Sequence, residues 1–101
     1  MRNLVVCCDG TWNTRDQRTN GVPTPTNVSR LYNAVDKDSQ VPHVMDYNPG
    51  VGTEGSFLDK ILGGVVGEGL RKNIVSAYKW LADIYEEGDR IFLFGFSRGA
   101  Y

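Results

Sequence analysis

The residues best suited to chemistry lie in the segment 95–99, which reads Gly-Phe-Ser-Arg-Gly and follows the apolar run 91–94. The spacing matches G-x-S-x-G, a pattern that places a serine on a sharp turn between a strand and a helix. A hydroxyl exposed there can attack an acyl carbonyl once a base has removed its proton. Gly95 and Gly99 suit such a turn, because side chains at these positions would collide with the neighbouring strand and helix. The pattern therefore predicts that Ser97 is a nucleophile.

A pattern as short as G-x-S-x-G also occurs by chance, so the interpretation of Ser97 as a nucleophile depends on the elements predicted around it. A buried strand precedes it, a long amphipathic helix precedes that strand, and the small Ala100 follows Gly99 where a helix must pack close to the sheet. The alternative is a glycine-rich turn that closes a strand–helix–strand unit around an incidental serine. The combined context favours the nucleophile.

Alternating strands and helices must position this turn. Apolar and β-favouring residues predict strands at residues 3–8, 41–47 and 90–94. Strands that alternate with helices indicate an α/β fold, here a parallel sheet of about three strands with helices on both faces, ending at the turn around Ser97. With 101 residues and no internal repeat, the chain is expected to belong to a single domain.

Two helices are expected between these strands. The first begins at an N-cap at Thr26-Asn27 and continues to about Asp36. The second covers residues 70–87 and is closed by Gly88. Its core-facing stripe is predicted to consist of Leu70, Ile74, Ala77, Tyr78, Leu81, Ile84 and Tyr85. Trp80 falls off this stripe.

Two long connections lack a regular pattern. Residues 13–25 are polar, contain glycine and proline, and are expected to form a long loop. Loops of that length in compact domains often carry function. Residues 50–69 are rich in glycine, and a short helix at 57–62 is expected inside them.

Two further motifs point to other chemistry, and each fails at an essential position. Residues 9–11 read Asp-Gly-Thr, as in phosphatases of the haloacid dehalogenase type, but Cys7 occupies the position of their nucleophilic aspartate. Residues 50–55 match G-x-G-x-x-G, a dinucleotide fingerprint that should join a strand directly to a helix. Pro49 and Ser56 interrupt that connection, so a flexible loop on the substrate side explains the second motif better.

The single histidine and the two cysteines are assigned structural roles. His43 precedes Ser97 and begins a strand, whereas α/β-hydrolases carry the triad histidine after the serine. Cys7 and Cys8 are neighbours in a strand and point to opposite faces, so a disulfide between them is not expected. Small buried thiols suit a reducing compartment. No metal site and no cofactor is predicted.

Composition and charge exclude several classes of function. The net charge of −1 and the scattered basic residues give no electrostatic footprint for nucleic acid. The apolar runs are far shorter than the roughly 20 residues needed to cross a bilayer, and the N-terminus does not resemble a secretory signal. A cytoplasmic protein is therefore expected, with signal-independent export left open. The oligomeric state is not indicated.

Three separated segments together resemble one family of bacterial and fungal α/β-hydrolases, whose best-understood members are phospholipase effectors of type VI secretion. The segments are residues 5–13, 48–53 and 95–101, so they span nearly the whole chain. The resemblance implies hydrolysis of a carboxylic or phospholipid ester through a Ser-Asp-His triad, with Ser97 as the nucleophile. It also implies that the acid and the base lie beyond Tyr101. The chain is thus expected to be the N-terminal part of an incomplete catalytic domain.

Such an enzyme needs two backbone N–H groups to hold the oxyanion of the tetrahedral intermediate. One is expected from Arg98, directly after the nucleophile, and the other from the loop after the first strand, at Gly10 or Thr11. Asp9 either holds that loop through Asx-type hydrogen bonds or is a plain turn former. Without a base that follows Ser97, the alternative is a catalytically inactive α/β module with a structural or interaction role.

Overall fold

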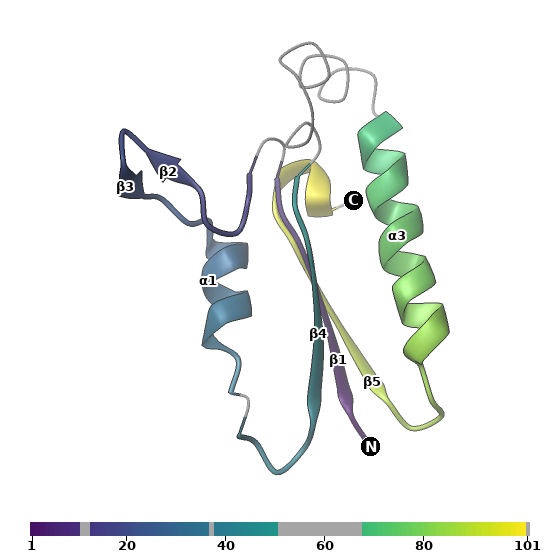
Figure 1. The fold of residues 1–101 in the computed structure, drawn as a ribbon. Coiled ribbons are helices and arrows are strands. Elements are labelled where there is room, and N and C mark those ends of the chain that lie inside the picture. The colour runs from purple at the N-terminus through teal and green to yellow at the C-terminus, as the bar shows by residue number, and fades with distance from the viewer. Residues whose placement is uncertain (11–12, 37, 51–67, 101) are drawn as a thin grey trace.

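The computed structural model describes residues 1–10, 13–36, 38–50 and 68–100. Figure 1 shows their elements, which are β1 (Asn3–Cys8), β2 (Arg18–Thr19), β3 (Val22–Pro23), α1 (Asn27–Ala34), β4 (His43–Asn48), α3 (Glu68–Ile84), β5 (Arg90–Gly95) and a 3-10 helix (Ser97–Ala100). The short helix expected at 57–62 lies outside the described residues, as does the glycine-rich motif after Gly50.

β1 lies at the centre of a three-stranded sheet of order β4-β1-β5. Both neighbours run parallel to it, and Asn3 pairs with His43 of β4 and with Arg90 of β5. Residues 4–7 of β1 are all buried, whereas β4 is mostly half-buried and β5 is exposed along its length. The predicted parallel sheet of about three strands is confirmed, and its most buried strand is the first in the sequence.

α1 and α3 lie on opposite faces of this sheet (Figure 1). The crossover through α1 steps from β1 to β4, and the crossover through α3 steps back past β1 to β5. Because parallel crossovers are almost always right-handed, two connections that step in opposite directions place their helices on opposite faces. The prediction of helices on both faces is confirmed.

One buried cluster lies between β1 and α1, while Leu4 and Val6 are buried on the other face of β1. Val5 and Cys7 of β1 pack with Val28 of α1. Three half-buried residues complete this cluster, namely Tyr32, Met45 and Tyr47. Residues paired across a parallel ladder share a face, so Phe92 and Phe94, the β5 partners of the two β1 residues, also lie on the α1 face.

The segment 13–25 is not the irregular loop that its polar composition predicts. β2 and β3 pair antiparallel, with Thr19 opposite Val22. The two residues between them, Asn20 and Gly21, have φ values of +52° and +80°. Positive φ at both central positions defines the type I′ hairpin turn, for which Asn-Gly is a favoured sequence. The loop prediction was wrong because it overlooked this pair.

α3 packs on the sheet with part of the stripe that its apolar spacing predicts, since Ala77, Leu81 and Ile84 are half-buried as expected. Ile74, Tyr78 and Tyr85, all expected in the core, are 51%, 74% and 49% exposed. Trp80, expected off the core-facing stripe, is half-buried. Within residues 71–84 of the helix, the half-buried positions are Asn73, Ala77, Trp80, Leu81 and Ile84. The apolar residues of α3 cover a wider arc of the helix surface than the side that contacts the sheet. The spacing of these residues alone therefore does not determine which of them pack against the sheet.

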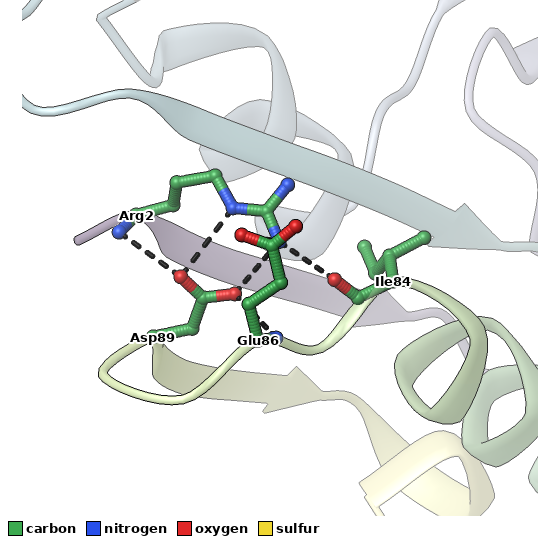
Figure 2. A network of polar contacts seen from close by, with 4 residues as sticks. All are labelled: Arg2, Ile84, Glu86 and Asp89. Carbon is green, nitrogen blue, oxygen red and sulfur yellow. Dashed lines mark hydrogen bonds and ion pairs between the residues drawn. The ribbon is translucent and has the colours of Figure 1, made fainter.

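The turn from α3 to β5 is tied to the start of β1 by Arg2 and Asp89 (Figure 2). Arg2 Nη2 donates to Ile84 O at 2.6 Å and to Asp89 Oδ2 at 2.7 Å. The hydrogen bond from Arg2 lowers the pKa of Asp89 to about 2, from an ordinary value of 3.8. α3 ends at Ile84 rather than at the predicted Glu87, and Gly88 turns the chain with a φ of +94°.

Candidate active site

Ser97 stands between a strand and a short helix. β5 ends at Gly95, and the 3-10 helix begins at Ser97 itself. The φ of Ser97 is +56°, in the left-handed region that residues other than glycine seldom adopt. Backbone conformations of this kind cluster at active sites. The tight strand-to-helix turn that the sequence predicts is present at Ser97.

Close contacts require both glycines of this turn. A Cβ added at Gly95 would lie 2.5 Å from Ala100 Cα, in the returning 3-10 helix. A Cβ added at Gly99 would clash with Asp9 O and would lie 2.7 Å from Cys8 O. The atoms in the way belong to the backbone, so they cannot swing aside as a flexible side chain would. These contacts give the physical reason for the G-x-S-x-G spacing.

The end of β1 lies directly beside the turn. Phe96 N donates to Cys8 O at 3.0 Å, and Gly99 N donates to Phe96 O at 2.9 Å. Gly10 lies against the Phe96 ring, whose Cδ1 is 2.5 Å from the place that a Cβ at Gly10 would take. The prediction that β1 runs parallel and adjacent to β5, with Gly10 at the same end as Ser97, is confirmed.

Asp9 follows β1 and is only 2% exposed. Its Oδ1 accepts a hydrogen bond from Gly10 N at 2.9 Å. Its Oδ2 accepts from Thr26 Oγ1 at 2.9 Å and from Tyr47 OH. The loop-holding role considered for Asp9 is therefore present as the bond to Gly10. The hydrogen bonds of Asp9 with Thr26 and Tyr47 could not be predicted from sequence motifs, because these partners lie 17 and 38 residues away along the chain.

Thr26 and Tyr47 connect Asp9 to two further elements. Thr26 is the N-cap of α1, as the sequence predicts, and its Oγ1 accepts from Ser29 N at 3.1 Å. Tyr47 lies in β4, where burial and then its hydrogen bond to Asp9 raise the pKa of its phenol well above the usual range. Tyr47 therefore keeps its proton and remains a donor. The Asp9 carboxylate thus joins the ends of β1 and β4 to the start of α1.

The bond between Asp9 and Gly10 also bears on the expected oxyanion donors. Gly10 N–H already donates to Asp9 Oδ1, so it could serve an oxyanion only as a shared donor. Thr11, the other residue named for this role, lies outside the described residues. Arg98 belongs to the 3-10 helix directly after Ser97, where the donor next to a nucleophile is expected.

His43 lies at the opposite end of the sheet from Ser97. It begins β4 and pairs with Asn3, whose Nδ2 is 3.1 Å from the His43 Nδ1. Ser97 follows the other end, where Gly95 pairs with Cys8. At about 3.3 Å per residue, the length of a strand separates the imidazole from the serine hydroxyl. The predicted position of His43 at a strand start is confirmed.

The cysteines offer no second reactive centre. Both are free thiols, Cys7 buried and Cys8 half-buried. Burial raises the pKa of the Cys7 thiol to about 11, so little of it is thiolate at neutral pH. In the described part of the chain, no three His, Cys, Asp or Glu side chains are grouped to hold a metal ion. Among the described helices, none has the length and apolar character to cross a membrane.

Comparison with known proteins shows the family of this chain. The model of the family described as "T6SS, Phospholipase effector Tle1-like, catalytic domain" matches residues 2–101. The chain belongs to this family, and the resemblance drawn from its three motifs is confirmed. The chain is also similar to the uncharacterised protein YEL023C of Saccharomyces cerevisiae, with 35% identity over 99% of this chain and 16% of that protein. The chain thus spans a small part of the length of the curated relative it matches. No solved structure matches it.

Proposed function

We propose that this chain supplies the nucleophile and part of the oxyanion hole of a serine hydrolase that cleaves carboxylic esters. The observation that carries the proposal is the backbone of Ser97, with a φ of +56° at the end of β5. Gly95 and Gly99 support it, because their contacts leave no room for side chains. The carboxyl ends of parallel strands, where this turn lies, are the usual ligand-binding edge of α/β sheets.

In the proposed reaction, Ser97 Oγ attacks the ester carbonyl while a histidine takes its proton, and the alcohol leaves with that proton. Water then attacks the acyl-enzyme by the same route, which releases the acid and restores the serine. Arg98 N–H and a second N–H, from Gly10 or Thr11, hold the oxyanion. Because Gly10 N–H also donates to Asp9 Oδ1, we prefer Thr11 of the two.

We assign the acid and the base of the triad to residues outside these 101. The support is geometric, since His43 is the single histidine of the sequence and begins β4 at the end remote from Ser97. The yeast relative, of which the chain spans 16%, has ample further length for both groups. The chain is then an incomplete catalytic domain, as the resemblance implies.

The family favours a lipid substrate and delivery by secretion. A phospholipase effector catalytic domain acts on a phospholipid ester, and we propose an acyl ester as the bond cleaved here. Export by a type VI machine would fit the same description. The triad mechanism needs no cofactor.

A second candidate function is an inactive α/β module with a structural or interaction role. The observation that favours it is the exposure of the four apolar residues of β5, with Ile91, Phe92, Leu93 and Phe94 at 46%, 40%, 68% and 41%. An apolar strand open on both faces is suited to contact with another protein surface. The two functions differ in whether Ser97 reacts.

Covalent labelling of the full gene product with a fluorophosphonate tests this difference, because the probe reacts with an activated serine. We expect one label, on Ser97, together with release of fatty acid from phosphatidylglycerol vesicles, and loss of both in Ser97→Ala. Ser76→Ala is the matched control, because Ser76 is exposed on α3. Labelling that survives Ser97→Ala would overturn the assignment of the nucleophile. A product that neither labels nor releases acid would favour the interaction module.

A further inference from the structure

The turn at Ser97 is braced by the residues that end β1. Cys8 O accepts from Phe96 N just before the serine, and Asp9 O lies against Gly99 just after it. Gly10 fills the space under the Phe96 ring. The contacts flank Ser97 on both sides, so a displacement of the end of β1 would displace the serine.

The end of β1 is itself held by the side chain of Asp9. The carboxylate is 2% exposed and accepts three hydrogen bonds, from Gly10 N in its own loop, Thr26 Oγ1 at the start of α1 and Tyr47 OH in β4. A buried carboxylate is tolerated only when such bonds satisfy it, so these partners fix its position closely. One buried group thereby sets the relative places of three elements.

We propose that Asp9 is a positioning residue for Ser97, an inference that rests on the function proposed for the serine. Its carboxylate, held by Tyr47 and Thr26, fixes the end of β1, and that end fixes the turn through Gly99 and Phe96. Asp9 takes no part in bond making. It keeps Ser97 Oγ and Arg98 N–H at the places from which they meet the carbonyl and the oxyanion.

A positioning role of this kind predicts an effect on turnover that exceeds the effect on substrate binding. Catalytic geometry is sensitive to displacements of about 1 Å, which can cost about a hundredfold in rate. Removing one hydroxyl from the network leaves Asp9 with two of its three bonds, so a smaller displacement is expected. For Tyr47→Phe in the full gene product we expect kcat to fall about tenfold while KM stays within about twofold.

Tyr32→Phe is the matched control. Tyr32 packs edge-on against Tyr47, with ring centroids 5.5 Å apart, so it occupies the same cluster and loses the same atom. Its hydroxyl is not among the three donors to Asp9. A second pair uses Thr26, where Thr26→Val removes the donor and Thr26→Ser keeps it. We expect the serine variant to retain the turnover that the valine variant loses.

Hydrogen exchange in the peptide 96–100 provides a readout that does not depend on activity. If Asp9 braces the turn, exchange there should be about fivefold faster in Tyr47→Phe than in Tyr32→Phe, as expected for the loss of one hydrogen bond. Unchanged exchange in both Tyr47→Phe and Thr26→Val would overturn the positioning role, whatever the activity. Faster exchange together with no Ser97-dependent turnover in the unsubstituted product would instead retain Asp9 as a brace and overturn the proposed function.

Discussion

Ser97 occupies a backbone conformation that surrounding contacts must stabilise. A left-handed conformation costs a residue other than glycine about 1–2 kcal/mol relative to the right-handed one. The hydrogen bonds of Phe96 N to Cys8 O and of Gly99 N to Phe96 O lie on either side of it. The strain at Ser97 is thus held in place by its immediate neighbours in sequence and by the strand next to β5.

Substituting Gly99 tests whether this close approach matters. In Gly99→Ala the new Cβ would meet Asp9 O and Cys8 O, so the turn must move away from β1. We expect a loss of about 1–3 kcal/mol in the free energy of unfolding, measured with urea, as for other overpacked sites. Labelling of Ser97 should fall in the same variant.

Gly21→Ala is the control for this substitution. Gly21 has a φ of +80° with nothing within 4 Å of its added Cβ, so this variant suffers backbone strain without a steric clash. It should lose stability without losing the labelling of Ser97. Equal labelling in Gly99→Ala and Gly21→Ala would contradict a steric role for Gly99.

At the scale of residues, the sequence predicts features that depend on local backbone geometry. Ser97 on its turn and Thr26 as an N-cap belong to this class, because fixed spacings of residue types encode them. The bond from Tyr47 to Asp9 belongs to another class. It joins residues 38 apart, so it exists only after β4 has paired beside β1.

At the scale of elements, the sequence predicts the position of a strand that is buried on both faces. It does not determine which face of an amphipathic helix packs against the sheet. β1 shows an unbroken apolar run because both of its faces are covered, and its predicted bounds match those observed. α3 is apolar over a wider arc than its contact with the sheet uses, so Ile74, Tyr78 and Tyr85 were assigned to the wrong side.

The junction of α3 with β5 should depend on pH through Asp89 (Figure 2). The folded pKa of about 2 lies below the ordinary 3.8, so the ionised carboxylate stabilises the folded state fully above about pH 4. That stabilisation is lost as the pH falls toward 2. We therefore expect Asp89→Asn to be less stable than the unsubstituted protein at pH 6, with a difference that shrinks between pH 4 and pH 2. Urea unfolding at several pH values measures this difference.

Asp83→Asn provides the charge-matched control for this measurement, because Asp83 is exposed on α3. At pH 6 we expect Asp83→Asn to lose less stability than Asp89→Asn, because Asp89 is bonded to Arg2. A constant deficit of Asp89→Asn down to pH 2 would mean that the shape of the side chain, and not its charge, joins Arg2 to the turn.

At the scale of the whole molecule, Ser97, the proposed nucleophile, and His43 lie at opposite ends of one sheet. Ser97 follows the carboxyl end of β5, and His43 begins β4 at the amino end. We therefore expect the 101-residue chain alone to show no Ser97-dependent hydrolysis of an activated short-chain ester such as a p-nitrophenyl acyl ester. The full gene product should hydrolyse it.

The substitution His43→Ala checks the geometry behind this expectation. It should leave the turnover of the full product unchanged, because the imidazole contacts Asn3 and lies remote from the turn. Turnover by the 101-residue chain that disappears with His43→Ala would show that His43 reaches Ser97 and acts as its base.

The central place of β1 has a consequence for the order of events during synthesis. β1 precedes both of its neighbours in the sequence, and the Arg2–Asp89 contact beside β1 and β5 joins residues 87 apart. At translation rates of about 5–20 residues per second, synthesis of the residues between Arg2 and Asp89 takes about 4–17 s, and β5 follows only after this interval. The apolar residues 4–7 of β1 stay without their β5 partner throughout this interval. A nascent chain paused between β4 and β5 therefore presents an unpaired edge of its most apolar strand to chaperones.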